Sequence, residues 1–330
     1  MDPIRISYHT LRADPASHKD AIKAGLGSQP GALGVVIVED LPSTYPALRT
    51  RLLQLAPRLA SLPDSDKTRL ESPETTYSFG WSHGKERMNG QPDTAKGSYY
   101  ANPLVDAPLV SEERKKKYPE YYAGNIWPDV EGLEGFEGAF KELGQFVATV
   151  GIALAEACDA VGLAPRPVTP LIQRSQSNKA RLLHYFPSPA GSQADDACGT
   201  HIDHSLLTGL CSALYLQPRA DEFVPVPPPS ADAGLWIYPR GSREAVKVQI
   251  PPDCLAFQTG EALEVLSGGR LAATPHYVSG GTGSADVSRE TFAFFLQPDV
   301  DDVIGADGET FGQFTKRVLK RHYANGTPTM

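Results

Sequence analysis

The stretch Thr200-His201-Ile202-Asp203-His204 places an imidazole and a carboxylate two residues apart. Side chains on a β-strand alternate between its two faces, so His201 and Asp203 are predicted to project side by side from one face. Such a pair supplies two ligands of a type that binds divalent metals. His204 would then point to the opposite face, and we exclude it as a ligand. A lone His-x-Asp often arises by chance, so the pair needs support from elsewhere in the chain.

That support comes from two later segments. His276 lies in a short segment between the glycine-containing turns at 267–269 and 280–283. Arg289 and Thr291 then open a long apolar run, and the period of two places them on a common face. A guanidinium beside a hydroxyl is well matched to a carboxylate. Two histidines and an aspartate make the facial triad that holds non-haem Fe(II) and leaves positions open for O2 and substrate.

These motifs, in this order, resemble those of the Fe(II)/2-oxoglutarate-dependent dioxygenases of the isopenicillin N synthase and plant hormone-oxidase type. The family pattern is His-x-Asp, a distal His, and then Arg-x-Ser on the next strand. Upstream, the segment Arg181-Leu-Leu-His184-Tyr185-Phe186-Pro187 resembles the family's Arg-x-Asn-Tyr-Tyr-Pro strand. The agreement runs from about Tyr77 to Pro298, which is most of the chain.

The resemblance implies a role for each of these residues. His201, Asp203 and His276 would be the iron ligands, and Arg289 with Thr291 would hold the distal carboxylate of the cosubstrate 2-oxoglutarate. Zinc would accept the same three ligands, but an open face beside a carboxylate anchor favours iron with an oxo-acid.

The contacts around the cosubstrate match the family only in part. Tyr185 or His184 would complete them by hydrogen bonding. The chain departs from the family here, because His184 stands where Asn is common and Phe186 replaces a tyrosine, and phenylalanine cannot donate a hydrogen bond.

The expected fold class is α+β and mainly β. From about residue 171 the chain becomes short apolar runs separated by Gly, Pro, Asn and Asp, which is typical of a β-sandwich or jelly roll. We predict a double-stranded β-helix (jelly-roll) catalytic core over 171–300, an N-terminal α/β region with supporting helices over 1–165, and a helical tail over 301–330. The predicted strands of the core are 182–186, 200–203, 206–216, 235–238, 245–249, 254–258, 271–278 and 291–297.

The N-terminal region is predicted to contribute strands and helices in alternation. Its segments are a strand at 4–8, a helix at 16–26, a strand at 34–38, a helix at 45–62 and a long helix at 133–158. The long helix has one apolar stripe that ends before Gly162. In the family such a helix supports the barrel from outside.

The stretch from Tyr77 to Asn102 matches a passage that lines the substrate side of the barrel in the family. Its aromatic and basic residues either face the substrate or cap the core, and the sequence leaves both open. If they face it, a small and partly apolar metabolite is expected, with an acid as one candidate. The candidate substrate residues are Tyr77, Trp81, His83, Tyr99 and Tyr100, and the side chains suited to a carboxylate are His83, Lys85 and Lys96.

Composition limits the partners. The chain has 330 residues, 41% of them hydrophobic, and a formal net charge of -8, which argues against nucleic acid. Its four cysteines form no C-x-x-C pair, and a thiol-reducing compartment is the simpler interpretation. With no uninterrupted apolar run of 18 residues and no leader pattern, we expect a cytoplasmic protein that is monomeric and binds no membrane.

The expected activity is oxidation of a small-molecule metabolite with O2, by hydroxylation, desaturation or cyclisation, with release of succinate and CO2. Two alternatives stay open. One is an Fe(II) oxidase that needs no 2-oxoglutarate, as in isopenicillin N synthase, which keeps the Arg-x-Ser pair. The other is a non-catalytic jelly-roll binding protein that retains the pocket.

Overall fold

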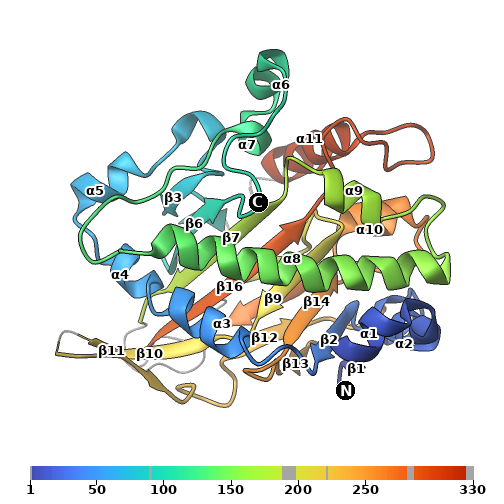
Figure 1. Ribbon diagram of the computed structural model, residues 1–330, viewed down its shortest axis with the longest axis horizontal. Helices are drawn as coiled ribbons and strands as arrows, with labels where there is room; N and C mark the ends of the chain where they lie inside the picture. Colours follow the sequence, from blue (N-terminus) through green and yellow to red (C-terminus); the bar gives the residue numbers. More distant parts are fainter. Residues whose placement is uncertain (1, 89–90, 188–197, 221, 281–285, 325–330) are drawn as a thin grey trace.

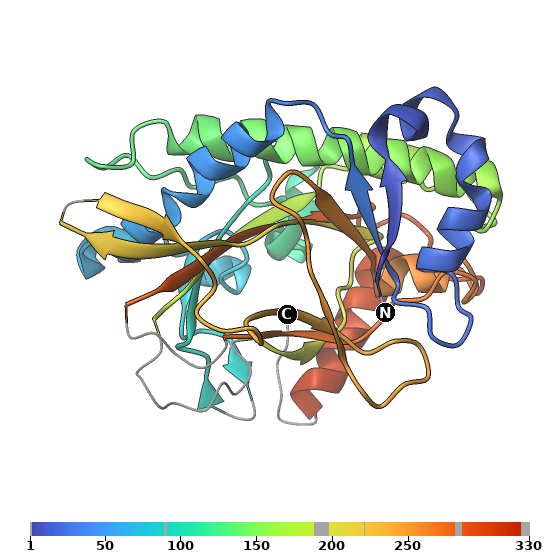
Figure 2. The same ribbon diagram turned by 90° about the horizontal axis from the view of Figure 1, so that it is seen from below.

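A computed structural model describes residues 2–88, 91–187, 198–220, 222–280 and 286–324. The protein is mixed α/β and rich in sheet: a ten-stranded sheet lies between a layer of helices and a smaller four-stranded sheet (Figures 1 and 2). One hydrophobic cluster lies under the helices, and a second lies between the two sheets, with members from both. The candidate metal centre lies beside this second cluster, between the two sheets.

The large sheet combines strands from the whole chain. Its order is β1-β2-β14-β9-β16-β7-β6-β3, and the hairpin β10-β11 joins it through β16. β1 and β2 pair in parallel, and β2 then pairs antiparallel with β14. The N-terminal strands therefore continue the sheet of the predicted core. The strand bounds are β1 (Ile4–Ser7), β2 (Val35–Glu39), β3 (Gly80–His83), β6 (Lys96–Ala101), β7 (Lys179–Tyr185), β9 (Leu207–Cys211), β10 (Leu214–Arg219), β11 (Glu222–Val226), β14 (Leu255–Thr259) and β16 (Ser288–Leu296).

The small sheet has the order β13-β12-β15-β8. Its strands are β8 (Cys198–His201), β12 (Gly234–Ile237), β13 (Val246–Val248) and β15 (His276–Ser279). A separate two-stranded hairpin is formed by β4 (Arg87–Met88) and β5 (Gln91–Pro92).

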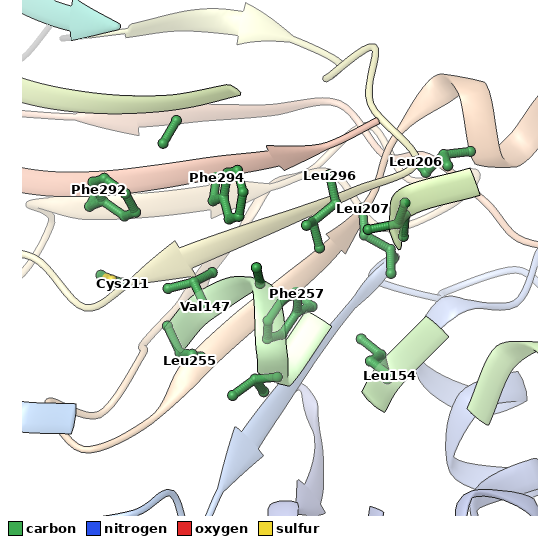
Figure 3. Packing of buried hydrophobic residues seen from close by; sticks show 14 of the residues in the cluster. Val147, Leu154, Leu206, Leu207, Cys211, Leu255, Phe257, Phe292, Phe294 and Leu296 are labelled. Carbon is green, nitrogen blue, oxygen red and sulfur yellow. The ribbon is translucent and has the colours of Figure 1, made fainter. Parts of the chain in front are cut away.

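The long helix α8 (Phe136–Val161) crosses the outer face of the large sheet (Figure 1). It is long and apolar enough to cross a membrane, but 56% of its most apolar window is buried inside the protein, as in the core helix of a globular domain. Glycine allows the close approach, because a Cβ at Gly151 would lie 2.3 Å from Leu296. Figure 3 shows Val147 and Leu154 of this helix among the side chains of the sheet.

The other helices surround this layer and the ends of the sheets. They are α1 (Tyr8–Ala13), the 3-10 turn η1 (Pro15–His18), α2 (Lys19–Leu26), α3 (Tyr45–Leu53), α4 (Ala56–Ala60), α5 (Asp64–Arg69), η2 (Pro73–Thr75), α6 (Glu112–Lys117), α7 (Pro119–Tyr122), α9 (Thr169–Arg174), α10 (Glu261–Leu266) and α11 (Phe311–Ala324).

Several predicted elements differ from the observed ones for local reasons. The predicted strand 206–216 is interrupted at 212–213, where the guanidinium of Arg49 donates to both carbonyls. Its two parts, β9 and β10, both run antiparallel to β16, with a register shift of one residue between them. The predicted helix 45–62 is two helices, with Pro57 in the first turn of the second. Strand β15 begins only after Pro275, which has no N–H to donate. β11 lies between the predicted strands 206–216 and 235–238, where no strand was predicted, and the short helices α1 and α10 were not predicted.

Candidate metal centre

Strand pairing brings the two predicted histidine ligands together. His201 ends β8 and His276 begins β15, and the two are partners in the antiparallel register of these strands. Their ring centroids lie 4.3 Å apart. Asp203 completes the group: its Oδ1 lies 3.7 Å from Nε2 of His201 and 3.9 Å from Nε2 of His276.

The strand argument for Asp203 does not hold in detail. β8 ends at His201, so Asp203 lies in irregular backbone beyond the strand. The main chain is fixed there by the N–H of Glu261, which donates to the carbonyl of Asp203 at 2.7 Å. The carboxylate thus reaches the histidines because α10 holds this turn in place. His204 lies apart from the triad, with its ring packed edge-on to Phe314.

The donor set fits a divalent metal ion. Its ligand atoms all lie within 4.8 Å of one another. Atoms about 2.0–2.2 Å from one ion must lie within roughly 4.4 Å of each other, so the carboxylate–imidazole distances of 3.7 and 3.9 Å need little adjustment. Burial, and to a smaller extent the nearby His201, lowers the pKa of His276 to about 4. This ring is therefore neutral at pH 7, as a metal ligand must be. Burial alone would raise the pKa of Asp203, but the two imidazoles lower it below its ordinary value.

Backbone contacts orient both rings. Nδ1 of His201 donates to the carbonyl of Gly199 at 2.7 Å, and Nδ1 of His276 lies 3.2 Å from the carbonyl of Thr274. With the proton on Nδ1, Nε2 of the neutral His276 presents a lone pair toward Asp203. Burial would lower the pKa of His201, but Cys198 and Asp203 raise it to about 9, so a bound metal ion would displace the second proton of this ring. The amide nitrogen of Gln258 lies 2.8 Å from Nδ1 of His276 and donates to the carbonyl of Thr274 at 3.3 Å. An N–H at Nδ1 needs the amide oxygen there instead. That oxygen is buried without a partner among the described residues, and the reversed amide would give it one.

A second feature lies beside the triad, in a cavity between the sheets. Nε and Nη1 of Arg289 are buried and have no hydrogen-bond partner among the described residues. Buried donors without acceptors are unfavourable unless a bound ligand supplies the acceptors. The cavity is lined by Arg181, Leu183, Tyr185, Cys198, His201, Asp203, Leu210, Cys211, Leu235, Ile250, His276, Val278, Arg289, Thr291, Ala293 and Phe295.

Three of the four residues predicted to hold the cosubstrate line this cavity: Arg289, Thr291 and Tyr185. The prediction was wrong for His184. Its side chain projects from the other face of β7, where Nδ1 lies 2.9 Å from a carboxylate oxygen of the buried Glu290. The alternation along β7 that turns Tyr185 into the cavity necessarily turns His184 away from it.

A neighbouring cavity shares two of the three clustered ligands, His201 and Asp203. It is lined by Ser78, Tyr100, Glu120, Tyr121, Lys179, Arg181, His201, Ile202, Asp203, His204, Ser205, Phe295 and Gln297. Tyr100 is the one member of the predicted substrate set in this lining, and its hydroxyl donates to Glu86 at 2.8 Å.

The other predicted substrate residues lie elsewhere. Trp81 packs across Gly97 in the core, where a Cβ on the glycine would lie 2.2 Å from the indole. Tyr99 is fully buried against Phe136 and donates to a backbone carbonyl. Of the two alternatives left open for these residues, Trp81 and Tyr99 therefore follow the one in which they pack in the core. Tyr77 and His83 are half-buried outside the cavity lining.

Two of the basic side chains considered for a carboxylate are already paired, and the third has a backbone partner. Lys96 contacts Asp93 and Glu86, and Lys85 contacts Glu71 at 3.0 Å. Nε2 of His83 lies 3.1 Å from the carbonyl of Thr94.

The basic residues that do line the cavity, Lys179 and Arg181, were not predicted as site residues. Both lie on β7, on the face that also carries Tyr185. The period-two pattern used for Arg289 and Thr291 would have found them if it had been extended toward the start of the strand.

No protein-family model matches the chain. A curated 2-oxoglutarate-dependent dioxygenase of Gibberella zeae (strain PH-1) is 24% identical over 273 residues, which is 79% of this chain and 64% of that protein. A putative 2OG-Fe(II) oxygenase family protein of Caulobacter crescentus has a TM-score of 0.71 at 19% identity, covering 97% of this chain and 99% of its own. A Neurospora crassa protein in complex with alpha-KG and thymine has a TM-score of 0.70 at 17% identity, covering 97% of each chain.

The fold is therefore that of the 2-oxoglutarate/Fe(II) oxygenases, and the clustered His, Asp and His residues lie in its interior. The curated relative is itself a 2-oxoglutarate-dependent dioxygenase. The chain's match spans about 64% of the length of that relative. The narrower resemblance to the isopenicillin N synthase type stays a prediction.

Proposed function

We propose that this chain is an Fe(II)- and 2-oxoglutarate-dependent oxygenase that oxidises a small molecule by hydroxylation, desaturation or cyclisation. One observation carries the proposal: the three clustered ligands line the same cavity as Arg289, whose Nε and Nη1 have no hydrogen-bond partner among the described residues. A metal site alone would suit zinc as well. A buried cation with two unused donors beside it calls for an anion, which favours an oxo-acid cosubstrate.

The two sheets would form the halves of a double-stranded β-helix around this cavity. The hydrophobic cluster between them supports this arrangement, because strands of both sheets contribute to it. The similarity to solved oxygenase folds supports it as well. We place the catalytic core at 171–300, extended by N-terminal strands of the region 1–165 and followed by the tail 301–330.

The residues divide the work. His201, Asp203 and His276 would hold Fe(II), and Arg289 would pair with the distal carboxylate of 2-oxoglutarate. Bound Fe(II) supplies O2 activation coupled to oxidative decarboxylation, so that hydroxylation consumes substrate, 2-oxoglutarate and O2 and yields product, succinate and CO2. The apolar side chains of Leu183, Leu210 and Val278 would exclude water from the cosubstrate.

The orphaned donors of Arg289 also weigh against the two alternatives. An oxidase without 2-oxoglutarate would leave them unsatisfied unless its own substrate filled that cavity. A binding module needs no clustered metal ligands. We further propose a cytoplasmic protein, since the four cysteines are free and buried, and a small-molecule substrate rather than nucleic acid, since the net charge is -8. A monomer stays a prediction.

The test is succinate formation from 2-oxoglutarate by purified protein, measured with and without Fe(II). The expected result is slow succinate release without added substrate that needs both Fe(II) and O2, and that His276→Ala abolishes. Equal succinate release with and without Fe(II), or none in any condition despite folded protein, would overturn the proposal.

A further inference from the structure

The two cavities lie one after the other along the paired strands β7 and β16, and the register of the pair gives the order of the residues that line them. Tyr185 pairs with Arg289 at one end, Arg181 with Ala293 in the middle, and Lys179 with Phe295 at the other end. With about 3.3 Å per residue, Lys179 lies roughly 20 Å along the strand from Tyr185. The cosubstrate anchor and Lys179 are thus at opposite ends, and Arg181 lines both cavities between them.

Lys179 is a buried cation with little to neutralise it. Its residue is 7% exposed, and no carboxylate lies within ion-pair distance in the part of the chain that the structure describes. Its Nζ donates to the backbone carbonyl of Glu120. The nitrogen also lies 4.6 Å from the ring centroid of Phe79 and 5.4 Å from that of Tyr121. An ammonium has three N–H donors, and these contacts use one of them.

The other cations near this cavity are neutralised by carboxylates. Arg181 contacts Glu86 at 2.7 Å and also donates to the hydroxyl of Ser98. Glu86 in turn lies 3.4 Å from Lys96, which has a second partner in Asp93. Two carboxylates thus balance two cations in this cluster. Lys179 stands outside it.

Leaving an ammonium in such surroundings is costly. Burial lowers the pKa of Lys179 to about 7, and the nearby Glu120 only partly opposes this. The charged form therefore lacks a close anionic partner among the described residues. An anion entering the cavity would supply that partner.

We propose that the ammonium of Lys179 binds a carboxylate of the primary substrate, which is then a small monocarboxylic acid with a flat apolar body. This inference rests on the proposed function, because it takes the cavity beside the metal ligands as the substrate site. Lys179 has no ion pair among the described residues and can pair with one carboxylate, while Glu120 in the same lining disfavours a second negative charge. Tyr100, Tyr121 and Phe295 line the same cavity and offer aromatic surface to the rest of the molecule.

The test is binding of small acids to the metal-free protein by isothermal titration calorimetry. The probes are phenylacetate, 3-phenylpropionate and cyclohexylacetate, each paired with its primary amide. The wild-type protein is expected to bind at least one acid, and more tightly than the amide. Lys179→Met should lower the affinity for that acid by about tenfold to a hundredfold, as expected for loss of a charge-assisted hydrogen bond. The acid and its amide should then bind with the same affinity.

Two further variants serve as controls. Lys179→Arg keeps the charge and should retain the preference for the acid. Lys115→Met removes an exposed lysine that pairs with Glu112 and should bind as wild type. The Lys179→Met protein should fold, because methionine fills the space beside the rings of Phe79 and Tyr121. Thermal unfolding checks this, and Lys179→Gln replaces it if the melting temperature falls.

Several outcomes would overturn the inference. One is that no acid of the panel binds, and another is that the amides bind as tightly as the acids. A third is that Arg289→Met, and not Lys179→Met, weakens acid binding, which would assign the acids to the cosubstrate cavity. Since this binding needs no metal, it is independent of succinate formation. A protein that binds acids through Lys179 but forms no succinate would refute the proposed function alone.

Discussion

Arg289 lies directly opposite Tyr185 in the antiparallel pair of β16 and β7, with its guanidinium carbon 4.9 Å from the centre of the phenol ring. The ring holds one face of the guanidinium and leaves Nε and Nη1 without protein partners among the residues described. A planar cation held in this way is prepared for a bidentate contact with a carboxylate.

The first prediction concerns this contact. Arg289→Met should weaken the binding of 2-oxoglutarate by about 2 to 5 kcal/mol, because it removes a charge-assisted contact in a partly buried site. The measurement is the concentration of 2-oxoglutarate that gives half-maximal succinate formation. Arg5→Met removes an exposed arginine that pairs with Glu39 and is the control. An unchanged dependence in Arg289→Met would mean that this residue has another role.

The second prediction concerns the metal ligands. His276→Ala should lose most of the affinity for Fe(II), measured anaerobically by equilibrium dialysis, because two ligands remain of three. His204→Ala should keep it, since that ring packs against Phe314 instead. Loss of iron in His204→Ala with retention in His276→Ala would exchange the two assignments.

The third prediction concerns the ion pairs beside the cavity. Burial would raise the pKa of Glu86, but Arg181 and Lys96 lower it to about 2. A folded-state pKa below the ordinary value of 4.5 means that the carboxylate stabilises the protein above about pH 4.5 and loses this effect as the pH falls toward 2.

Glu86→Gln should therefore reduce the free energy of unfolding by about 3 kcal/mol at pH 7. The difference from wild type should shrink between pH 4.5 and pH 2. Urea unfolding at a series of pH values measures it. A difference that stays constant across this range would show that ionisation of Glu86 contributes nothing.

The fourth prediction uses two glycines of α8. A Cβ at Gly151 would lie 2.3 Å from Leu296 and 2.9 Å from Phe257, so Gly151→Ala should cost about 1 to 3 kcal/mol by overpacking. At Gly138 the nearest atom is 3.9 Å away, in the Glu142 side chain. Gly138→Ala should stabilise by up to about 1 kcal/mol through helix propensity. Equal effects of the two substitutions on thermal unfolding would contradict the packing of α8 on the sheet.

Sequence patterns located the candidate site better than they explained it. The order His201, Asp203, His276 and Arg289 was predicted from short motifs, and the fold brings all four to one cavity. The reason given for Asp203 was a regular strand, whereas a hydrogen bond from Glu261 holds it in place. Contacts of this kind join distant segments and leave no local periodic signal.

The substrate side shows the opposite result. The sequence left open whether the aromatic residues from Tyr77 to Asn102 face the substrate or cap the core, and Trp81 and Tyr99 are core residues. Polarity and aromaticity alone do not tell which face of a strand is buried when both faces are covered. Lys179 was overlooked because a single lysine in a sequence usually indicates surface. Its burial follows from the pairing of β7 between β6 and β16.

The most direct test of the account is an anaerobic titration of the metal-free protein with Fe(II) and then with 2-oxoglutarate, followed in the visible region. We predict one Fe(II) bound per chain and a weak charge-transfer band that needs both additions, with no band in His276→Ala. In Arg289→Met the band should require much more 2-oxoglutarate. Iron binding without the band would contradict the cosubstrate assignment and indicate an oxidase that needs no 2-oxoglutarate. No iron binding by folded protein would contradict the metal centre itself.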